Sequence, residues 1–350
     1  MGETHPPLRV CSYEDRAAAM DSLILMGESL CAVDRDVTLH LTVPDAPDSV
    51  RAWARRRPQV VLSTTRPQAV TGWDVKPWLL LQELNEGRRE ALWLDDDMIV
   101  TRALSPVVRQ YPPDCLILAE EWVRSDAKPV SHFWQMPAGR TILPVNNCFI
   151  RVTQAHRPLL ERYLQMTADP RYRAAQALPA ERRPLHLLHD GWILIALLES
   201  AEFSHVPFEW IRRGRHIAQC AGSSGYRPGD RLLDLFRGLP PLIHGLGRKP
   251  WEPQREPSRL QHFLLDLATD VSPYLLAARR VARNIDMTPD WLEARTGTGA
   301  MLRKLTAGHP GMAGLPLASL HALHMKVNQI VGLIGKKESE KRQEMTAGQG

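Results

Sequence analysis

The sequence predicts an α/β protein, with a mostly parallel β-sheet flanked by helices and a helical C-terminal region. Two observations support this fold class. In the first part of the 350-residue chain, short β-prone apolar runs alternate with amphipathic helical segments, a pattern typical of parallel sheets covered on both faces. Beyond residue 258, apolar residues recur at helical spacing.

The first part of the chain shows this alternation most clearly. Val37–Val43 alternates Val and Leu with Thr and His, which is the pattern of a half-buried strand. Glu14–Ala32 instead places its apolar residues at helical spacing. We expect strands at Leu8–Tyr13, Val37–Val43, Val60–Leu62 and Trp93–Asp97, and helices at Glu14–Ala32, Ser49–Arg57 and Pro77–Asn85.

The middle of the chain continues the pattern less regularly. Arg212–Asp230 is rich in Arg and Gly, and we expect a loop there. The remaining expected elements are strands at Cys115–Ala119, Cys148–Val152 and Phe203–Val206, and helices at Gln154–Met166 and Leu187–Leu198.

Composition divides the chain into three regions. Residues 252–257 are rich in Pro and charge and predict a linker between residues 1–252 and a helical region at 258–335. In that helical region, Ser272-Pro273 and Thr288-Pro289 resemble an N-cap followed by the first residue of a helix. Residues 336–350 are charged and polar, and we expect a disordered tail.

The bulk composition argues against several classes of protein. Hydrophobic residues make up 44% of the chain, enough to bury a core, and charged residues make up 24%. The net charge of +5 favours anionic partners but is too mild to indicate nucleic-acid binding. Five cysteines without CxxC spacing indicate neither a zinc cluster nor a disulfide framework.

We expect a soluble, cytoplasmic protein with no transmembrane segment. The first residues are polar and Pro-rich, and no apolar signal-peptide core follows them. The longest apolar run, Trp192–Leu198, is far too short to span a bilayer. An odd number of cysteines also suits a reducing compartment.

Three consecutive carboxylates follow an apolar run at Asp95, Asp96 and Asp97. If the run is a strand, Asp95 and Asp97 share one side while Asp96 points away. Two carboxylates held close repel unless a cation lies between them, and Mg²⁺ and Mn²⁺ are the usual ions at paired carboxylate oxygens. Ligands of parallel sheets bind beyond the carboxyl ends of the strands, where this triplet falls. A solvated Asp-rich turn is the alternative interpretation.

Two strings resemble motifs of a known family. Trp93–Asp97 (WLDDD) resembles the DxD motif of nucleotide-sugar glycosyltransferases of the GT-A fold, a Rossmann-like α/β fold. His244–Trp251 (HGLGRKPW) is similar to the HxxGxxKPW string of the retaining family-eight, glycogenin-like group. The string in this chain has one residue fewer between Gly247 and Lys249.

The resemblance implies a metal-dependent transferase and a set of site residues. It makes Asp95, Asp97 and His244 the ligands of Mn²⁺ or Mg²⁺, and it brings Lys249 to the diphosphate of the donor. Gly245 and Gly247 would let the backbone approach phosphate oxygens closely. Further matches that would contact the donor are weaker and comprise Ser12, Tyr13, Lys76, Asp96, Asn146 and Asn147.

The chain departs from the family at one position of the site. Where the family reads Asp-Gln-Asp, this chain has Asp190, Gly191 and Trp192. We expect Asp190 to act in catalysis by orienting the sugar, with a general base of an inverting reaction and a helix N-cap as alternatives. Core packing is the favoured interpretation of Tyr13 over a stacking platform, and Lys76 is equally interpretable as a surface lysine at a helix start.

We therefore expect residues 1–252 to form a catalytic domain that moves a sugar from a nucleoside diphosphate sugar, by resemblance a UDP-sugar, with retention of configuration. The acceptor, whether glycan, small molecule or protein, is not indicated. The alternative is a non-catalytic nucleotide-sugar-binding or scaffold protein of the same fold. A sugar nucleotidyltransferase is disfavoured because no GxGxR loop follows Leu8–Tyr13.

Overall fold

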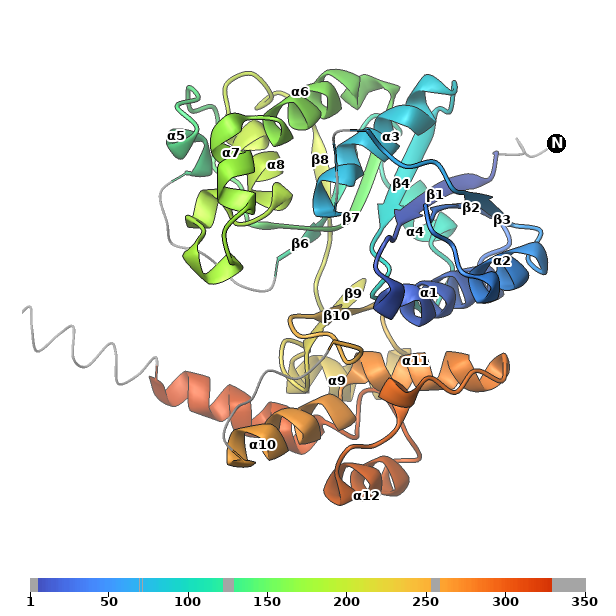
Figure 1. Cartoon of the computed structure of the whole chain (residues 1–350). Coiled ribbons are helices and arrows are strands. Elements are labelled where there is room, and N and C mark those ends of the chain that lie inside the picture. The colour runs from blue at the N-terminus through green and yellow to red at the C-terminus, as the bar shows by residue number, and fades with distance from the viewer. Residues whose placement is uncertain (1–5, 69, 71, 122–128, 253–258, 329–350) are drawn as a thin grey trace, which may run out of the picture.

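The computed structural model of the chain describes residues 6–68, 70, 72–121, 129–252 and 259–328 (Figure 1). β7 runs antiparallel to its neighbours β4 and β6, whereas the other adjacent strands of the main sheet are parallel. This confirms the predicted mostly parallel sheet. Its seven strands lie in the order β3 (Val60–Ser63), β2 (Val37–Thr42), β1 (Leu8–Tyr13), β4 (Glu90–Leu94), β7 (Val145–Thr153), β6 (Leu116–Glu120) and β8 (Phe208–Ile211).

Helices cover both faces of this sheet, as expected from its parallel strands. Successive strand residues point to opposite faces, so Cys11 and Trp93 belong to one core and Val10 and Leu92 to the other. The first core is closed by α3 (Val75–Asn85), α6 (Arg157–Thr167) and α8 (Asp190–Glu199). The second is closed by α1 (Met20–Val33), α2 (Asp48–Arg55) and α4 (Ser105–Arg109). Two shorter helices, α5 (Val130–Phe133) and α7 (Pro170–Gln176), lie beside α8 (Figure 1).

A second, three-stranded sheet lies below the first (Figure 1) and has the order β5 (Met98–Val100), β10 (Leu242–Leu246), β9 (Ile217–Ala221). β9 falls inside Arg212–Asp230, so the expected loop is wrong there. The Arg- and Gly-rich flanks obscure five central residues that are apolar except for Gln219. The expected strand at Phe203–Val206 is also wrong, because these residues form turns after α8 and the sheet gains β8 only from Phe208. Phe203 and Val206 are buried in the core without belonging to a strand.

The C-terminal region is helical, as the sequence predicts, and its described part contains α10 (Arg259–Asp270), α11 (Pro273–Asn284), α12 (Gly297–Leu305) and a helical stretch at 315–328. Ser272 is the N-cap of α11 and Pro273 its first residue, as expected. Thr288-Pro289, in contrast, precedes only the short 3-10 turn η6 (Asp290–Leu292). α11 packs against α1 and β10, and α9 (Pro228–Arg237) lies beside it (Figure 1).

The predicted linker, helical region and tail lie partly outside the residues that the structure describes. The expected tail at 336–350 lies outside the described residues, as do 329–335 of the helical region and 253–257 of the linker. The boundaries of the three regions therefore stay predictions. In the described ranges, no helix has both the length and the apolar character needed to cross a bilayer.

The contact between α1 and α2 provides a test of the packing. A Cβ atom added at Gly27 would lie 2.5 Å from Cη2 of Trp53 and 3.0 Å from Cδ2 of Leu39. We expect Gly27→Ala to lower the thermal unfolding midpoint, because overpacking costs about 1–3 kcal/mol, more than the roughly 0.4–1 kcal/mol gained from a stiffer unfolded chain. The matched control is Gly229→Ala in α9, where no described atom lies within 4 Å of the new Cβ. A midpoint for Gly27→Ala at or above that of the control would contradict this packing.

Candidate active site

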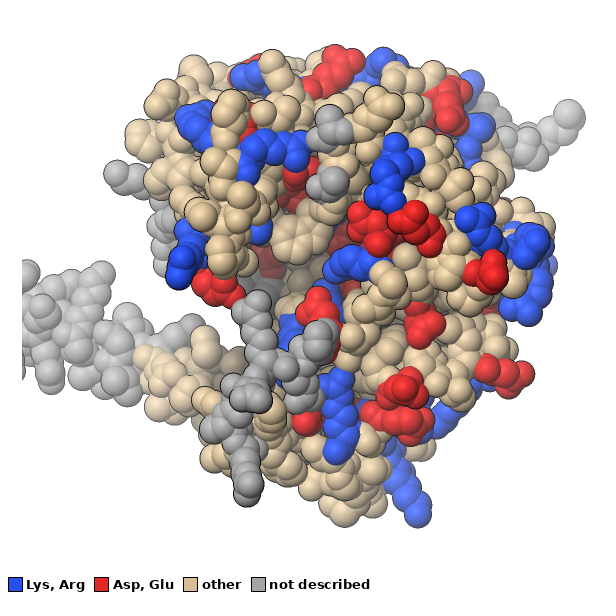
Figure 2. Space-filling view, in the orientation of Figure 1, with Lys and Arg blue, Asp and Glu red and all other residues tan. Residues whose placement is uncertain are grey.

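The chain changes direction across the sheet at β1. β2 and β3 extend the sheet on one side of β1, and β4 pairs with β1 on the other. A crevice at the carboxyl ends of the strands is expected at such a reversal. β4 ends at Leu94, so the expected strand at Trp93–Asp97 is wrong from Asp95 onward. Asp95 follows the strand directly and lies at its carboxyl end, as the sequence predicts. Figure 2 shows this face of the molecule hollowed near its centre, with acidic and basic side chains at the margins.

Asp95 is fixed by contacts from three elements. Its Oδ1 accepts a hydrogen bond from Nε1 of Trp93 at 2.6 Å, and Nζ of Lys76 lies 3.0 Å from the same oxygen. Its backbone N–H donates to the carbonyl of Cys148 on β7 at 3.0 Å. The carboxylate is thereby oriented while its side chain stays 22% exposed and open to a ligand.

The second sheet brings His244 to Asp97. β5 starts one residue after Asp97 and pairs with β10 so that Met98 lies opposite His244. The N–H of Gly245 also donates to the carbonyl of Asp97 at 2.9 Å. Nε2 of His244 then lies 3.2 Å from Oδ1 of Asp97. Together Asp95, Asp97 and His244 offer ligand atoms that all lie within 4.8 Å of one another.

The donor set fits a divalent cation. Two carboxylates and one imidazole are ligands that suit Mn²⁺ and, through the oxygens, Mg²⁺. Asp97 Oδ1 and His244 Nδ1 are buried without a hydrogen-bond partner among the described residues, and such orphaned polar atoms call for a missing ligand. Burial by itself would raise the pKa of Asp97, but Lys249 and His244 hold that pKa well below its usual range. The carboxylate is therefore charged and able to bind a cation.

Two ammonium groups, the buried one of Lys76 and the half-buried one of Lys249, flank the acidic pair. Lys249 donates to Oδ2 of Asp97 and, at 2.6 Å, to the carbonyl of Gly245. Burial alone would lower the pKa of Lys249, but Asp97 raises it above the ordinary value. Lys76 is 3% exposed, and Asp95 likewise outweighs burial and raises its pKa. Lys76 is therefore a buried ion-pair partner, and the surface-lysine alternative is wrong.

Asp190 is the first residue of α8 and is 1% exposed. Its Oδ2 accepts hydrogen bonds from Nδ2 of Asn147 at 2.8 Å and from the hydroxyl of Tyr163 at 2.7 Å. The helix N-cap is His189, whose Nδ1 accepts from the N–H of Gly191 at 3.1 Å. The N-cap alternative for Asp190 is therefore wrong. Asn147 connects the carboxylate to the acidic cluster, because its carbonyl accepts from Nζ of Lys76 at 3.2 Å.

Asp96 points away from the metal-ligand cluster. Its Oδ1 lies 3.7 Å from Nη2 of Arg16, and its backbone carbonyl accepts from Ser22 at 2.7 Å. Burial, with the charges of Glu14 and Asp97, raises the pKa of Asp96 well above its usual range. A group that resists ionisation is poorly suited to ligate a cation, in keeping with the predicted division of the triplet.

The other residues that we expect to contact the nucleotide-sugar donor do not belong to the group of candidate metal ligands. Ser12 is the next-to-last residue of β1, and its hydroxyl is buried and unpartnered among the described residues. Tyr13 ends the strand and packs in the core with its hydroxyl 3.0 Å from Asp15. Asn146 donates to Oε2 of Glu121 at 3.0 Å. Gly245 lies against Tyr274, where a Cβ would come within 2.9 Å of the ring, and Gly247 has a φ of 69° that favours glycine.

The structure adds acidic and phenolic groups that the sequence did not reveal. Asp74, just before α3, is 5% exposed and accepts from the hydroxyl of Tyr172 at 2.7 Å. Burial raises the pKa of Asp74 to about 6. Tyr172 lies on α7, 98 residues from Asp74, and Tyr163 lies on α6, 27 residues from Asp190, so no local pattern could have joined them to these carboxylates.

No family model and no curated protein matches this sequence. Solved structures of similar fold include the glycosyltransferase GlyE of Streptococcus pneumoniae TIGR4, with 12% identity, 83% of this chain and 66% of that chain covered, and a TM-score of 0.45. The galactosyltransferase LgtC in complex with donor and acceptor sugar analogs has 12% identity, coverages of 81% and 98%, and a TM-score of 0.49. Mouse xyloside xylosyltransferase 1 has 15% identity, coverages of 68% and 97%, and a TM-score of 0.42. The chain thus spans just under two thirds of the length of GlyE. A function for this chain is therefore inferred from the geometry of its own candidate site.

The Asp97 cluster yields a prediction about metal binding and stability. In Asp97→Asn, the half-buried ammonium of Lys249 loses its anionic partner, so we expect a loss of about 1–3 kcal/mol in the free energy of unfolding and loss of Mn²⁺ binding. The matched control is Asp96→Asn, which imitates a carboxyl group that already resists ionisation and should keep Mn²⁺ affinity. Denaturant unfolding and Mn²⁺ titration calorimetry measure both. Equal Mn²⁺ affinity in Asp97→Asn and the parent would rule out this ligand.

Asp74 predicts a pH dependence of stability. Its pKa is about 6 in the folded protein and about 3.9 in an unfolded chain, so the folded state binds more protons between these values and loses stability as pH rises through them. We expect Asp74→Asn, which stays neutral, to match the parent below about pH 4 and to exceed it by about 2–3 kcal/mol above about pH 6. Unfolding by denaturant across this range tests it, with exposed Asp45→Asn as the control. A difference that does not change with pH would contradict the shift.

Proposed function

We propose that the protein is a metal-dependent glycosyltransferase that takes a sugar from a nucleoside diphosphate sugar, with UDP-sugar as the favoured donor. The observation that supports this best is the convergence of Asp95, Asp97 and His244 between the buried Lys76 and the half-buried Lys249. A site that holds paired carboxylates, an imidazole and two ammonium groups at a strand edge is suited to a cation together with a diphosphate.

When bound, a divalent cation held by Asp95, Asp97 and His244 would stabilise the negative charge of the departing diphosphate. The lysines supply the same stabilisation from the protein itself. Lys249 binds Asp97 in the structure, and its contact with the carbonyl of Gly245 keeps the ammonium beside β10. A cation on Asp97 would compete for the carboxylate that Lys249 now neutralises, and the ammonium could then face the leaving group.

We assign the remaining residues around this centre to the donor. Lys76 would contact the sugar phosphate and the backbone at Gly245 and Gly247 the phosphate oxygens. Ser12, Tyr13 and Asp96 border the region for base and ribose, and Asn146 and Asn147 border the sugar.

Asp190 would orient the sugar. Two donors fix its Oδ2, which holds the carboxylate in one direction and suits orientation better than proton transfer. Retention of the anomeric configuration is the outcome that this arrangement favours. Inversion with Asp190 as general base is the competing mechanism, and NMR of the first-formed product distinguishes the two.

A non-catalytic nucleotide-sugar-binding protein is the second candidate. The observation that favours it lies at Gly191, where a Cβ would come within 2.9 Å of Cε1 of His189. The glutamine that the resembled family carries at this position therefore has no room here unless His189 moves. Catalysis through a glutamine side chain would then be lost, while the metal-ligand cluster stays in place for binding.

One experiment separates the two candidates. A panel of nucleotide sugars is screened for thermal stabilisation of the protein with and without Mn²⁺, and the stabilising donor is then tested for release of nucleoside diphosphate with and without acceptors. Mn²⁺-dependent stabilisation followed by release supports the transferase. Stabilisation without release across donors and acceptors supports the binding protein, and absence of any Mn²⁺-dependent stabilisation overturns both.

Lys249 gives a kinetic prediction for the transferase. Its ammonium matters most where charge develops on the leaving group, so Lys249→Ala should lower kcat by roughly 10²–10³-fold and change KM much less. Arg248 is the exposed neighbour of Lys249 in the same loop. The variant Arg248→Ala removes one positive charge there and serves as the control. Steady-state release of nucleoside diphosphate measures both variants. An effect on KM with kcat unchanged would contradict the assignment.

A further inference from the structure

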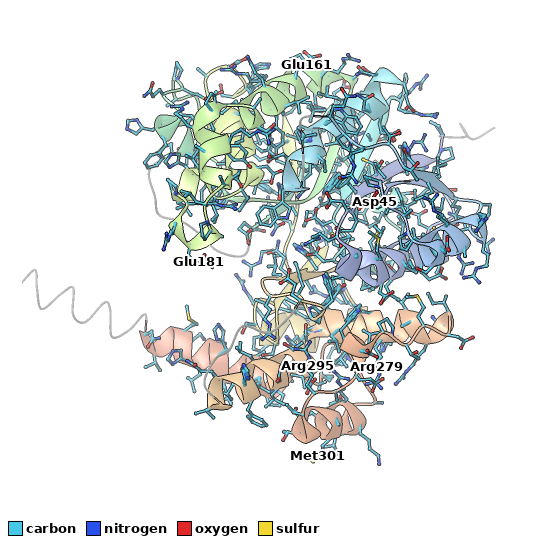
Figure 3. All side chains as sticks on the ribbon, in the orientation of Figure 1. Asp45, Glu161, Glu181, Arg279, Arg295 and Met301 are labelled. Carbon is cyan, nitrogen blue, oxygen red and sulfur yellow. The ribbon has the colours of Figure 1, made fainter. Side chains whose placement is uncertain are left out.

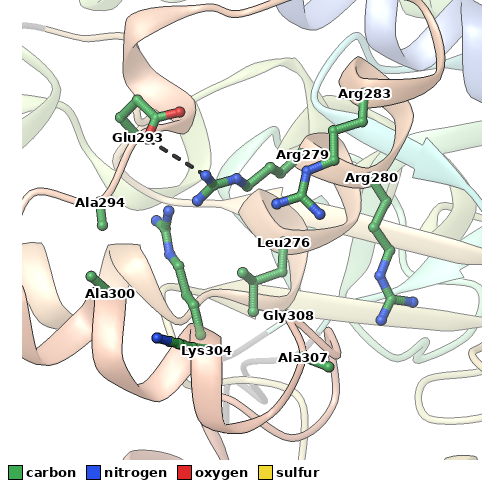
Figure 4. Close-up of a pocket in the computed structure, with 11 residues that line it drawn as sticks. Leu276, Arg279, Arg280, Arg283, Glu293, Ala294, Ala300, Lys304, Ala307 and Gly308 are labelled. Atoms are coloured by element: carbon green, nitrogen blue, oxygen red, sulfur yellow. Dashed lines mark ion pairs between the residues drawn. The ribbon is translucent and has the colours of Figure 1, made fainter.

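A second concave site lies in the C-terminal region. It is a pocket of about 470 Å³ between α11, η6 and α12 (Figure 4), and none of its lining residues belongs to the candidate active site. Figure 3 places Arg279 and Met301, which mark this region, at the end of the molecule opposite Glu161. The charged residues that line the pocket are Arg279, Arg280, Arg283, Arg303, Lys304 and Glu293.

Three of the cations come from one helix. Arg279, Arg280 and Arg283 lie on α11 at spacings that place Arg283 beside each of the other two. Figure 4 shows these side chains projecting from α11 over the space that faces Lys304 of α12. Like charges at such spacings destabilise a helix, so their convergence calls for a compensating anion.

The protein supplies little of that compensation. Arg279 has Glu293 at 3.5 Å, and Glu293 is the single acid among the described lining residues. Arg303 is fully engaged, because it donates to the carbonyl of Asp270 at 2.7 Å and to Oδ1 of Asp270 at 3.3 Å. Across the described ranges, no carboxylate lies within 4.0 Å of the cationic groups of the remaining three side chains, which are Arg280, Arg283 and Lys304.

The walls between these cations leave room for a ligand. Ala294, Ala300, Ala307 and Gly308 contribute only small side chains or none to the lining. Arg280, Arg283 and Lys304 are exposed residues, and the partial burial of Arg280, with the charge of Arg283 near it, lowers the pKa of Arg280. The pocket is therefore a hollow open to solvent, with a surplus of positive charge and small side chains between the cations.

We propose that this pocket binds a phosphate-bearing anion with at least two negative charges. Guanidinium groups match phosphate oxygens with paired N–H donors, and several arginines around one space are the usual arrangement for such a group. A single carboxylate would leave most of the surplus charge uncompensated. The ligand is either a free phosphate compound or the headgroup of an anionic lipid, which share this chemistry. This site is distinct from the donor site and does not depend on the transferase proposal.

The alternative is that the arginines only stabilise their own helix. Arg283 lies in the last turn of α11, where a cation interacts favourably with the helix dipole. Arg279 and Arg280 lie about a turn earlier, and that effect falls off within the last turn. A purely structural role predicts no affinity for phosphate.

The test uses the double variant Arg280→Ala/Arg283→Ala in the full chain. Calorimetric titration with inorganic pyrophosphate in EDTA, where the metal-ligand cluster is kept free of divalent ions, should show binding to the parent and a loss of roughly tenfold or more in the variant. Arg55→Ala/Arg56→Ala on the exposed end of α2 removes the same charge and should bind like the parent. The variant Arg280→Lys/Arg283→Lys keeps the positive charge but lacks the paired N–H donors of a guanidinium. Its affinity for pyrophosphate should lie between those of the parent and of the alanine variant.

A second experiment distinguishes a lipid headgroup from a free phosphate compound. Flotation with vesicles of phosphatidylcholine, alone and mixed with phosphatidylglycerol, asks whether the same double variant loses binding to the anionic vesicles. Loss in this arm identifies a lipid headgroup, and loss only with pyrophosphate identifies a free phosphate compound. If neither probe binds the parent better than Arg280→Ala/Arg283→Ala, or if the Arg55/Arg56 control loses as much, the proposal is overturned. Thermal unfolding of each variant confirms that it is folded.

Discussion

The antiparallel pairing of β5 with β10 is the constraint on which the candidate site depends. It joins segments almost 150 residues apart in the chain and places His244 opposite Met98, next to Asp97. α11 supports this pairing from below, since the ring of Tyr274 packs against Gly245. The hydroxyl of Tyr274 lies 3.0 Å from Ser22, which in turn donates to the carbonyl of Asp96. The described part of the C-terminal region, residues 259–328, therefore shapes the acidic turn, and the candidate metal ligands among the described residues all lie outside it.

Charge compensation explains how three adjacent carboxylates coexist in a buried turn. Two of the carboxylates are each paired with a lysine, and the third has a raised pKa. Asp95 is paired with Lys76 and Asp97 with Lys249, whereas Asp96 resists ionisation. The two paired carboxylates are the ones that face His244. Removing the charge of Asp97 would therefore not relieve repulsion in the metal-free protein, because that charge is already balanced by the ammonium of Lys249.

Local pattern in the sequence was sufficient wherever a residue's surroundings are close in the chain or repeat regularly. It placed β1 at Leu8–Tyr13 without error, predicted the mostly parallel sheet, and singled out the residues that the structure brings together at Asp95, Asp97 and His244. It failed where burial came from distant partners. β9 was hidden by its Arg- and Gly-rich flanks, and Phe203 and Val206 are buried in turns, where apolar alternation has no meaning. The tyrosine partners of Asp74 and Asp190 come from other helices, so only the fold reveals them.

The proposed function requires that Asp95, Asp97 and His244 bind a single divalent cation. Pulsed electron paramagnetic resonance of the Mn²⁺-loaded protein tests it most directly, because it detects the nitrogen of a coordinating imidazole. We expect nitrogen coupling in the parent protein and its disappearance in His244→Gln, while the buried His156→Gln variant retains it. A parent spectrum without nitrogen coupling, or coupling that survives in His244→Gln, would contradict the claim.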